Sequence, residues 1–443
     1  MSSQKTSSCL IRAAELSDGT RTDVRIDGGV IVETGSLTPG AGERTIDADG
    51  LLLLPGFVDL HTHLRQPGGE GAETVLSGSR AAAAGGFTTI HAMPNTTPAA
   101  DSPGVVEQVA ALGEEAGYVD VRPIGAVSKG REGKELAELV AMARSRARVR
   151  IFSDDGSCVA DPLLMRRALE YARIVDGVIA QHAEEPRLTA GAQLHDGAVA
   201  ADLGLKGWPA VAEEAIIARD ALLAESTDSR LHVCHVSTAG SVEVLRWAKA
   251  RGIRITAEVT PHHLWLTDES ARGYDARYKV NPPLRTDEDV TALRAALADG
   301  TIDAVATDHA PHPAEAKRSE WSAAAMGMVG LESAVLVVQA AMIETGLMGW
   351  PEVERAMSRR PAEIGGLAAA ARPIAEGRVA DLVLLDPAAR RTFAASDLAG
   401  RSTNSPFLGQ QLPGRVVATV FRGVPTVLDG RLREPEEVAA PWS

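Results

Sequence analysis

Short apolar runs alternate with longer alanine- and leucine-rich segments along most of the chain. The short runs have the composition of strands, and the longer segments have the composition of helices. Repeated strand–helix units predict an α/β protein with a parallel sheet, and eight units favour a (β/α)8 barrel of the TIM type over an open doubly wound sheet. The eight candidate strands, each followed by turn residues or polar side chains, are residues 57–63, 88–93, 119–126, 149–153, 177–182, 231–235, 255–259 and 304–307.

The two ends of the chain have a different pattern. Residues 8–54 contain short β-rich runs, and residues 378–385 and 415–428 look similar. Neither end has enough strands to form a stable sheet alone. We therefore expect one small β-sandwich domain built from both termini beside the barrel. The predicted boundaries are 1–54 for the N-terminal part of the sandwich, 55–366 for the barrel and 367–443 for the C-terminal part.

The composition is compatible with this size of fold. At 443 residues, of which 45% are hydrophobic, the chain can bury a large core. No stretch approaches the ~18 uninterrupted apolar residues of a membrane span, and the polar first residues lack the apolar region of a signal peptide. The three cysteines, Cys9, Cys158 and Cys234, have no Cys-x-x-Cys spacing. We therefore predict a cytoplasmic protein with reduced thiols.

The charge of the chain narrows the classes of partner. A formal net charge of −14 without a basic cluster argues against nucleic acid. Acidic and basic residues are well mixed, as expected for solvated helix faces. A small-molecule substrate is thus a better expectation than a nucleic acid or a membrane.

The end of the first candidate strand offers the first chemical signal. His61 and His63 are two residues apart, so they project from the same side of a strand and can bind one metal ion. Such a pair is weak evidence alone, because paired histidines also occur as buried structural residues. The residues at the other strand ends are needed to choose between a metal site and a pair of structural histidines.

Polar side chains recur where the candidate strands end. Because the carboxyl ends of barrel strands converge on one mouth, these side chains are expected to lie together. Histidine nitrogens and carboxylate oxygens suit two zinc-class divalent ions, with one carboxylate bridging them. The residues are His61 and His63 at the first strand, Asp154 and Asp155 at the fourth, His182 at the fifth, His235 at the sixth, and Asp308 at the eighth, with His309 and His312 beyond.

Any one of these side chains alone would more often be a hydrogen-bonded structural residue. Their joint placement changes this, since so many buried titratable groups without a metal would be costly. The remaining histidines carry a weaker signal. We expect His91, His195 and His232 to be structural, and we leave His262 and His263 as structural residues or as supports behind the ligands.

The motifs around these residues closely resemble type I dihydroorotases of the amidohydrolase superfamily. They follow the family's order and cover almost the whole chain. They are PGFVDLHTHLR (55–65), MPNT (93–96), FSDDG (152–156), QHAE (181–184), HVS (235–237), EVTPHH (258–263), NPPLR (281–285) and ATDHAPH (306–312).

The resemblance implies reversible interconversion of N-carbamoyl-L-aspartate and L-dihydroorotate in pyrimidine biosynthesis. It also implies two zinc ions per chain. Many relatives bridge their metals with a carboxylated lysine, but residues 153–156 contain none, which fits the type I branch. Strand alternation sets Asp154 and Asp155 on opposite faces, and the resemblance favours the second. The implied ligands are His61, His63 and Asp308 for one zinc, His182 and His235 for the other, and Asp155 for both.

The implied chemistry is attack by a metal-bridging hydroxide, with Asp308 as general acid and base. Arg65 lies on the same face as His63 and is expected to bind the substrate carboxylate outside the ring. Residues 311–327 read as a long loop suited to a lid. The substrate contacts expected from the resemblance are His63, Arg65, Asn95, Asn281, His312, Met326 and Gly327.

Two rival functions stay open at this point. Another cyclic amidohydrolase, such as an allantoinase or a dihydropyrimidinase (hydantoinase), would share the fold and the metals. A non-catalytic dihydroorotase-like subunit that scaffolds aspartate transcarbamoylase would not need the ligands, and all six are present here. A homodimer and an association with aspartate transcarbamoylase are also compatible with the resemblance.

Overall fold

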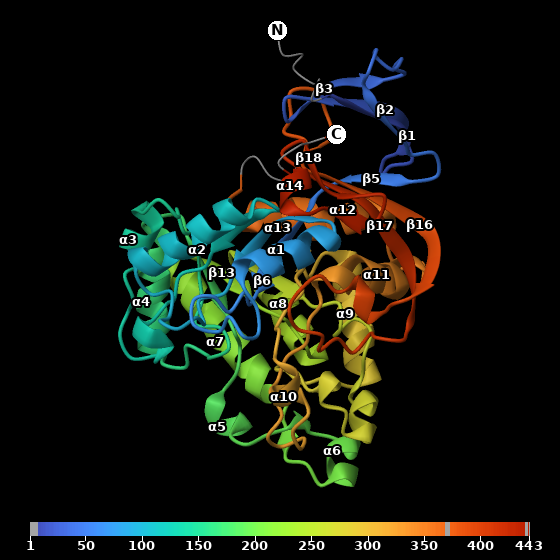
Figure 1. Ribbon diagram of the computed structural model, residues 1–443. Helices are drawn as coiled ribbons and strands as arrows, with labels where there is room; N and C mark the ends of the chain where they lie inside the picture. The colour runs from blue at the N-terminus through green and yellow to red at the C-terminus, as the bar shows by residue number, and fades with distance from the viewer. Residues whose placement is uncertain (1–7, 368–372, 439–441, 443) are drawn as a thin grey trace.

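The computed structural model describes residues 8–367, 373–438 and 442, which form an α/β fold (Figure 1). Parallel strands occur at all eight positions that the sequence pattern predicts, although several are shorter than expected. They are β6 (Phe57–Thr62), β7 (Phe87–Ala92), β8 (Asp120–Pro123), β9 (Ile151–Phe152), β10 (Val178–Gln181), β13 (Arg230–Val233), β14 (Ile255–Val259) and β15 (Ala304–Val305).

The parallel strands pair in sequence order. β6, β7 and β8 form one sheet, and β9, β10, β13, β14 and β15 form a second. Isolated parallel bridges join Gly125 to Phe152 and Thr62 to His309, so pairing continues between the two sheets at both edges. Every residue of β6 and β7 is buried, as is typical of parallel strands that are covered on both faces.

Helices follow the strands and pack around them, as Figure 1 shows. Several begin at a residue whose side chain satisfies the free backbone N–H groups of the first turn. Thr74 accepts from the backbone of Ser77, and Asp161 accepts from that of Leu164. The helices are α1 (Val75–Ala84), α2 (Pro103–Ala116), α3 (Leu139–Arg144), α4 (Pro162–Arg173), α7 (Val211–Thr227), α8 (Ala239–Ala250), α9 (Asp287–Asp299), α11 (Ala334–Val338), α12 (Trp350–Glu354) and α13 (Arg360–Ile364).

Three insertions extend the molecule beyond the carboxyl ends of the strands. They share a small apolar core that includes Leu194, Ala271 and Trp321. The predicted loop at 311–327 belongs to this region and contains a short helix. The inserted elements are α5 (Pro186–Thr189), β11 (Leu194–His195), α6 (Ala198–Leu203) and β12 (Gly207–Trp208), the 3-10 turns Asp268–Gly273 and Ala276–Tyr278, and α10 (Ala314–Lys317).

Strands from both chain ends form one mixed sheet of nine strands among the described residues. Figure 1 shows these N-terminal and C-terminal strands side by side. The two groups join where β5 pairs antiparallel with β16. The strands are β1 (Cys9–Glu15), β2 (Arg21–Asp27), β3 (Val30–Gly35), β4 (Arg44–Asp47), β5 (Leu52–Pro55), β16 (Leu382–Thr392), β17 (Gln411–Phe421), β18 (Val424–Leu428) and β19 (Arg431–Leu432), followed by helix α14 (Pro435–Val438).

This mixed sheet has a core of its own. Ile11 and Val24 from the N-terminal strands pack in one cluster with Leu384 and Val420 from the C-terminal strands. Burial of these side chains stabilises the association of the two chain ends, at roughly 1.5–3 kcal/mol for each fully buried aliphatic side chain. The two termini therefore fold together although they are far apart in sequence.

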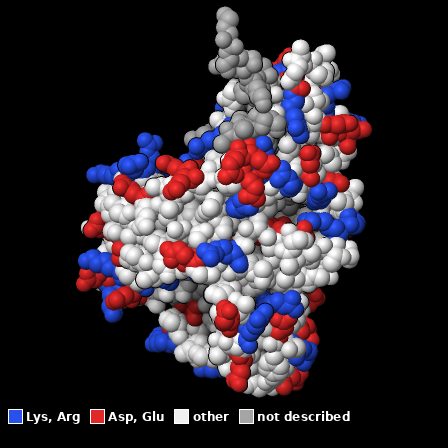
Figure 2. Space-filling view, viewed as in Figure 1, with Lys and Arg blue, Asp and Glu red and all other residues white. Residues whose placement is uncertain are grey.

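The surface has no strong charge segregation on the face that Figure 2 shows. Lysine and arginine side chains are interspersed with aspartate and glutamate over this face. The mixing predicted from the sequence is thus present there. Among the described residues, the helices are too short or too polar to traverse a lipid bilayer.

Candidate active site

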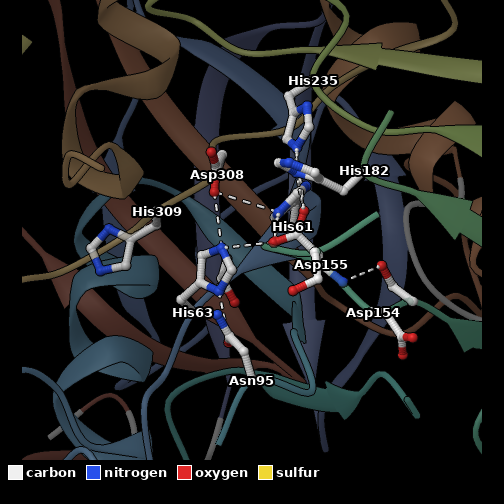
Figure 3. A network of polar contacts seen from close by, with 12 residues as sticks. His61, His63, Asn95, Asp154, Asp155, His182, His235, Asp308 and His309 are labelled. Atoms are coloured by element: carbon white, nitrogen blue, oxygen red, sulfur yellow. Dashed lines mark hydrogen bonds and ion pairs between the residues drawn. The ribbon is translucent and has the colours of Figure 1, made fainter. Parts of the chain in front are cut away.

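Six side chains point toward one another beyond the carboxyl ends of the parallel strands (Figure 3). Each lies on, or within three residues of, a strand end. All six are buried. Residues that the sequence pattern placed at one rim are therefore brought together: His61 in β6, His63 just after β6, Asp155 after β9, His182 after β10, His235 after β13 and Asp308 after β15.

Asp155 lies between two pairs of histidines. Its Oδ2 is 3.3 Å from Nε2 of both His61 and His63. Its Oδ1 is 3.2 Å from His182 Nδ1 and 3.2 Å from His235 Nε2. One carboxylate thus faces four imidazole nitrogens, which is the arrangement expected of a bridging ligand.

The neighbouring carboxylate, Asp154, points elsewhere, as Figure 3 shows. Its Oδ1 accepts hydrogen bonds from the backbone N–H groups of Val127 and Ser128, at 2.9 Å and 3.0 Å. The two adjacent aspartates therefore have different surroundings. They face different ways, as alternation predicted, and Asp155 is the one among the histidines, as the resemblance favoured.

Asp308 joins the first histidine pair. Its Oδ1 is 3.0 Å from His63 Nε2 and 3.4 Å from His61 Nε2. Asp308 and His235 both have positive φ, 47° and 32°, in a region that side chains other than glycine seldom occupy. Such conformations cost free energy and are concentrated at functional sites. Here they direct the side chains of Asp308 and His235 toward the cluster.

The outer nitrogen of His61 is held by a buried carboxylate. His61 Nδ1 donates to Glu258 Oε1 at 2.8 Å. The second oxygen of Glu258 accepts from His232 Nε2 at 3.0 Å. Burial alone would raise the pKa of Glu258, but His232 and His61 lower it to about 2, so the group is ionised. With its proton on Nδ1, His61 presents the lone pair of Nε2 to the cluster.

Two more histidines are oriented in the same way. His63 Nδ1 donates to Asn95 Oδ1 at 2.8 Å, and His182 Nε2 donates to Glu184 Oε2 at 2.9 Å. Their inner nitrogens are then left as lone-pair acceptors that face Asp155. Acceptors that face a carboxylate repel it unless a cation lies between them.

This repulsion between a nitrogen lone pair and carboxylate oxygens is clearest at His61. Its buried Nε2 has no hydrogen-bond partner in the described part of the chain, although oxygens of Asp155 and Asp308 lie 3.3 Å and 3.4 Å away. A divalent cation would satisfy all three groups. Ligand atoms within 4.8 Å of one another also define three triplets, and two of them, His61–His63–Asp155 and Asp155–His182–His235, share Asp155. The donor set therefore fits metal ions of the zinc class.

The electrostatics of the cluster agree with this conclusion. Burial alone would lower the pKa of His61, but Asp155 and Asp308 raise it well above the usual range. His182 behaves similarly: Asp155 and Glu184 overcome burial and raise its pKa to about 10. The cluster thus favours positive charge, which a proton supplies without metal and which a cation supplies when it binds.

Two of the predicted substrate contacts line the same region. Arg65 is largely buried, and its Nε donates to Pro311 O at 3.2 Å. Burial lowers the pKa of Arg65, while the nearby carboxylates of Asp308 and Asp155 oppose this effect. Asn281 Nδ2 donates to Glu184 Oε2 at 3.2 Å, and its buried Oδ1 has no partner among the described residues. That oxygen is available to accept a hydrogen bond from a ligand.

Three other predicted contacts, His312, Met326 and Gly327, lie on the segment after β15. His312 Nε2 donates to Met326 O at 2.8 Å, so the histidine holds the far end of its own loop. Two buried lysines that the sequence analysis did not select also hold this loop together. Lys317 Nζ donates to the backbone oxygens of Ala325 and Gly327, each at 2.8 Å.

Lys279 is the second buried lysine that holds this loop. Lys279 Nζ donates to Trp321 O at 2.5 Å and Ala324 O at 2.8 Å. Each ammonium group therefore satisfies backbone carbonyls that the irregular loop leaves unpaired. The loop that carries Met326 and Gly327 is held by these contacts in a defined conformation.

The other histidines differ in their surroundings. His91 belongs to β7, and His195 lies in the short strand β11, where its Nδ1 is 3.2 Å from Arg285 Nη1. His263 is hydrogen-bonded to Thr260 and to the backbone at Pro282. His262 differs from these, because its buried Nε2 has no partner among the described residues. The sequence analysis did not decide whether His262 and His263 are structural residues or supports behind the ligands. The structure shows that the two histidines have different surroundings.

The acceptors behind the ligands are the functional residues that the sequence analysis missed. Glu258 and Glu184 belong to recognised motifs but received no role. Glu258 is the one charged residue in the strand Ile255–Val259, and a charge in a buried strand is a signal that could have identified it. Glu184 follows His182 by two residues, which is a weaker signal.

Comparisons with known proteins agree with the geometry. Residues 50–241 match the family described as dihydro-orotase-like. The chain is 67% identical to a dihydroorotase from Leifsonia xyli subsp. xyli, over 96% of this chain and 97% of that protein. It is 60% identical to a dihydroorotase from Streptomyces coelicolor, over 96% of this chain and 100% of that protein.

Solved structures give a complementary match. The L-hydantoinase (dihydropyrimidinase) from Arthrobacter aurescens superimposes with a TM-score of 0.84 over 96% of this chain and 97% of that chain, at 26% sequence identity. This match shows a shared fold, whereas the two sequence matches are at much higher identity and extend over nearly the whole chain.

Proposed function

Because the chain belongs to the dihydroorotase family, we propose that its histidine and aspartate cluster interconverts N-carbamoyl-L-aspartate and L-dihydroorotate. This reaction is a step of pyrimidine biosynthesis, and its hydrolytic direction opens a cyclic amide. The observation that supports the proposal most is the position of Asp155 between two histidine pairs, in a chain that is so similar to named dihydroorotases.

The finer architecture is part of this proposal. We infer a (β/α)8 barrel, since the pairing from β6 to β15 returns to β6 through the bridge between Thr62 and His309. A β-sandwich from both termini is supported by the core that the two groups of strands share. The boundaries 1–54, 55–366 and 367–443 remain predictions.

Two zinc ions per chain are the proposed cofactors. Nitrogen and carboxylate donors suit zinc, and the unpartnered Nε2 of His61 supports a cation at that point. Zinc ions bound there would polarise a carbonyl oxygen and lower the pKa of a water molecule. The residues that would hold them are His61, His63 and Asp308 for one ion, His182 and His235 for the other, and Asp155 for both.

Asp308 is the proposed general acid and base. Burial alone would raise its pKa, but His61 and His63 lower the pKa below the usual range, so the carboxylate is ionised near neutral pH. It can accept the proton of the attacking water while the water oxygen bonds to the ring carbonyl carbon. It then gives this proton to the ring nitrogen as the carbon–nitrogen bond breaks. The products are a carbamoyl NH2 group and a carboxylic acid, which releases the second proton of the water to solvent and becomes a carboxylate. Ring closure takes up that proton and reverses each transfer.

Arg65 is proposed to bind the carboxylate that lies outside the ring. A guanidinium can donate two parallel hydrogen bonds to a carboxylate, and burial strengthens such a contact. Asn95 orients His63 through Oδ1, which leaves its Nδ2 for the substrate. Asn281 Oδ1 is a free acceptor for an N–H group of the pyrimidine ring. These contacts together would favour a dianionic open-chain substrate that carries amide groups.

The loop after β15 supplies the remaining proposed contacts. His312 holds the Met326 carbonyl, and Gly327 has a φ of 131°, which favours glycine. Backbone groups at Met326 and Gly327 would meet the substrate, because Lys317 and Lys279 already hold this segment in place. The identity of the side chain at 326 then matters less than the backbone conformation.

Substrate discrimination tests the proposed function. The zinc-loaded protein is assayed for ring opening of L-dihydroorotate, hydantoin, dihydrouracil and allantoin. We expect turnover of dihydroorotate to exceed that of the other three, because only dihydroorotate carries the carboxylate that Arg65 would bind. A preference for hydantoin, dihydrouracil or allantoin would indicate a different cyclic amidohydrolase. Absence of turnover with metal bound would indicate a scaffolding subunit.

Three further predictions concern assembly and location. A homodimer, an association with aspartate transcarbamoylase and a cytoplasmic location remain predictions from the resemblance and the composition. The reaction itself uses a small-molecule substrate, and the proposed ligand set is complete within one chain.

A further inference from the structure

A cavity lies at the opposite ends of the strands from the histidine cluster. Its volume is about 360 Å³, which is within the range of small-molecule sites. It opens where β8 and β9 begin and where the turn after β17 approaches them. The polar side chains that line it include His91, Arg122, Arg148, Arg150, Asp381 and Arg422.

The lining is cationic although the chain as a whole is strongly acidic. Four arginines face two aspartates, Asp120 and Asp381, in this cavity. Asp120 is already engaged, because its carboxylate lies 2.7 Å from Arg122 and 3.8 Å from Arg422. Asp381 accepts a hydrogen bond from the Arg422 backbone N–H at 2.7 Å. The excess of positive charge would attract an anion to this end of the molecule.

Arg148 is the arginine with the most freedom to bind such an anion. Its side chain makes no hydrogen bond or ion pair with any residue that the structure describes, and it is exposed. Its φ of 49° lies in the left-handed region, so the chain adopts an uncommon backbone conformation at this position. Arg150, by contrast, donates to the backbone oxygens of Ala143 and Val149.

His91 adds a buried acceptor to the same cavity. Its Nδ1 donates to Asp59 O at 2.8 Å, so the lone pair is on Nε2. Nε2 lies toward Gly365, where an added Cβ would be only 2.9 Å away, and Gly365 also lines the cavity. No hydrogen bond to this nitrogen occurs within the described ranges. A ligand that contains an O–H or N–H donor would satisfy it.

We propose that this cavity binds a small phosphorylated metabolite that also carries hydroxyl groups, with the phosphate at Arg148 and a hydroxyl donated to His91 Nε2. Guanidinium groups bind phosphate through paired hydrogen bonds, and the volume suits a ligand about as large as a sugar phosphate. The site is separate from the proposed active site, because it lies at the amino ends of the strands. A ligand there would not compete with the substrate.

Calorimetric titration of the zinc-loaded full chain with ribose 5-phosphate tests the proposal. Ribose and inorganic phosphate serve as the two partial ligands. We expect saturable binding of ribose 5-phosphate that is tighter than that of phosphate, and no binding of ribose. Dihydroorotate added in excess should leave this binding unchanged. No saturation up to about 10 mM, or displacement by dihydroorotate, would overturn the proposal.

Two matched variants locate the site. Arg148→Ala should weaken binding of ribose 5-phosphate about tenfold or more, since it removes a charged hydrogen-bond donor. Arg144→Ala removes an exposed arginine at the end of α3 that does not line the cavity, and it should bind as the wild type does. Both variants should keep full turnover of dihydroorotate. Equal binding by the two variants would show that the ligand is not held at Arg148.

Discussion

Glu258 Oε1 lies 2.8 Å from His61 Nδ1, on the side of the imidazole that faces away from the cluster. Both side chains are completely buried. The other oxygen of Glu258 accepts from His232, so the carboxylate fixes His61 from behind and is itself fixed. Partners of this kind set the tautomer and the orientation of a ligating histidine and increase its basicity.

Glu258→Gln should weaken zinc binding and, through it, activity. The amide is a poorer acceptor than the carboxylate, so His61 loses part of its orientation and basicity. We expect zinc affinity to fall by about 10- to 100-fold, with turnover partly restored by excess zinc. Competition with a chromophoric chelator measures the affinity, and dihydroorotate hydrolysis measures the turnover.

Asp220→Asn is a matched control for this variant. Asp220 is also buried, and it accepts from Gln181 Nε2 at 2.7 Å, but it contacts none of the proposed ligands within the described residues. The zinc affinity of the Asp220→Asn protein should equal that of the wild type. If Glu258→Gln bound zinc as tightly as Asp220→Asn does, the supporting role of Glu258 would be wrong.

Asp308→Asn should lose most of the turnover. Asparagine cannot accept the proton that the proposed mechanism moves to the ring nitrogen. A loss of about 10²- to 10⁴-fold in kcat is expected for removal of a general acid and base. Metal analysis of the same sample shows whether both ions remain. Asp154→Asn alters the adjacent acid that faces away from the histidines, and it should retain much more activity. Full turnover of Asp308→Asn with both metals bound would contradict the role of Asp308.

Arg65→Met should raise the Michaelis constant for N-carbamoyl-L-aspartate. Loss of hydrogen bonds to a charged group costs about 1.5–3 kcal/mol, which corresponds to roughly a 10- to 150-fold change. Arg65→Lys keeps the charge without the planar fork, so its Michaelis constant should be intermediate. The measurement is initial-rate kinetics in the ring-closing direction. An unchanged Michaelis constant and turnover in Arg65→Met would exclude this arginine as the carboxylate contact.

The sequence was sufficient to locate the site because its residues stand at strand ends. His61 near the end of β6 and His63 just after it point to the same side, and the mouth of a parallel sheet collects residues from different strands. The eight candidate strands are all present, although β9 and β15 are only two residues long. The pattern therefore identified where each strand ends. The strand ends, in turn, determine where the residues of the site lie.

The supporting contacts depend on features that a single sequence does not encode locally. The register of β13 and β14 pairs His232 with Thr256, which brings His232 next to Glu258 two residues further on. Simple alternation sets His232 and His235 on opposite faces, but His235 lies beyond the strand with φ of 32°. The shared sheet of the two termini likewise depends on the pairing of β5 with β16, which are more than 300 residues apart.

Cys9 predicts a pH dependence of stability. Burial raises the pKa of its thiol from 9.0 to about 12. In the unfolded chain the thiol ionises above pH 9, while in the folded chain it stays neutral, so unfolding becomes more favourable as the pH rises from 9 to 12. The free energy of unfolding decreases by at most about 1.4 kcal/mol per pH unit over this range. In Cys9→Ala, the free energy of unfolding should therefore fall less steeply over this range.

Ile11→Val on the same strand is the control for Cys9→Ala. Ile11 is buried and has no titratable group, so this substitution should cost about 0.5–1.5 kcal/mol at every pH. Denaturant unfolding at several values between pH 8 and pH 11 supplies the comparison. Parallel pH profiles for wild type and Cys9→Ala would mean that the Cys9 thiol ionises normally in the folded protein.

Zinc titration tests the central claim most directly. The protein is stripped of metal with a chelator, and zinc is added back in known amounts while ring opening of L-dihydroorotate is followed. We predict no significant turnover without metal, and activity that rises to a plateau at two zinc ions per chain. A metal-free protein that opens dihydroorotate at the full rate, or a plateau reached with no bound zinc, would contradict the account.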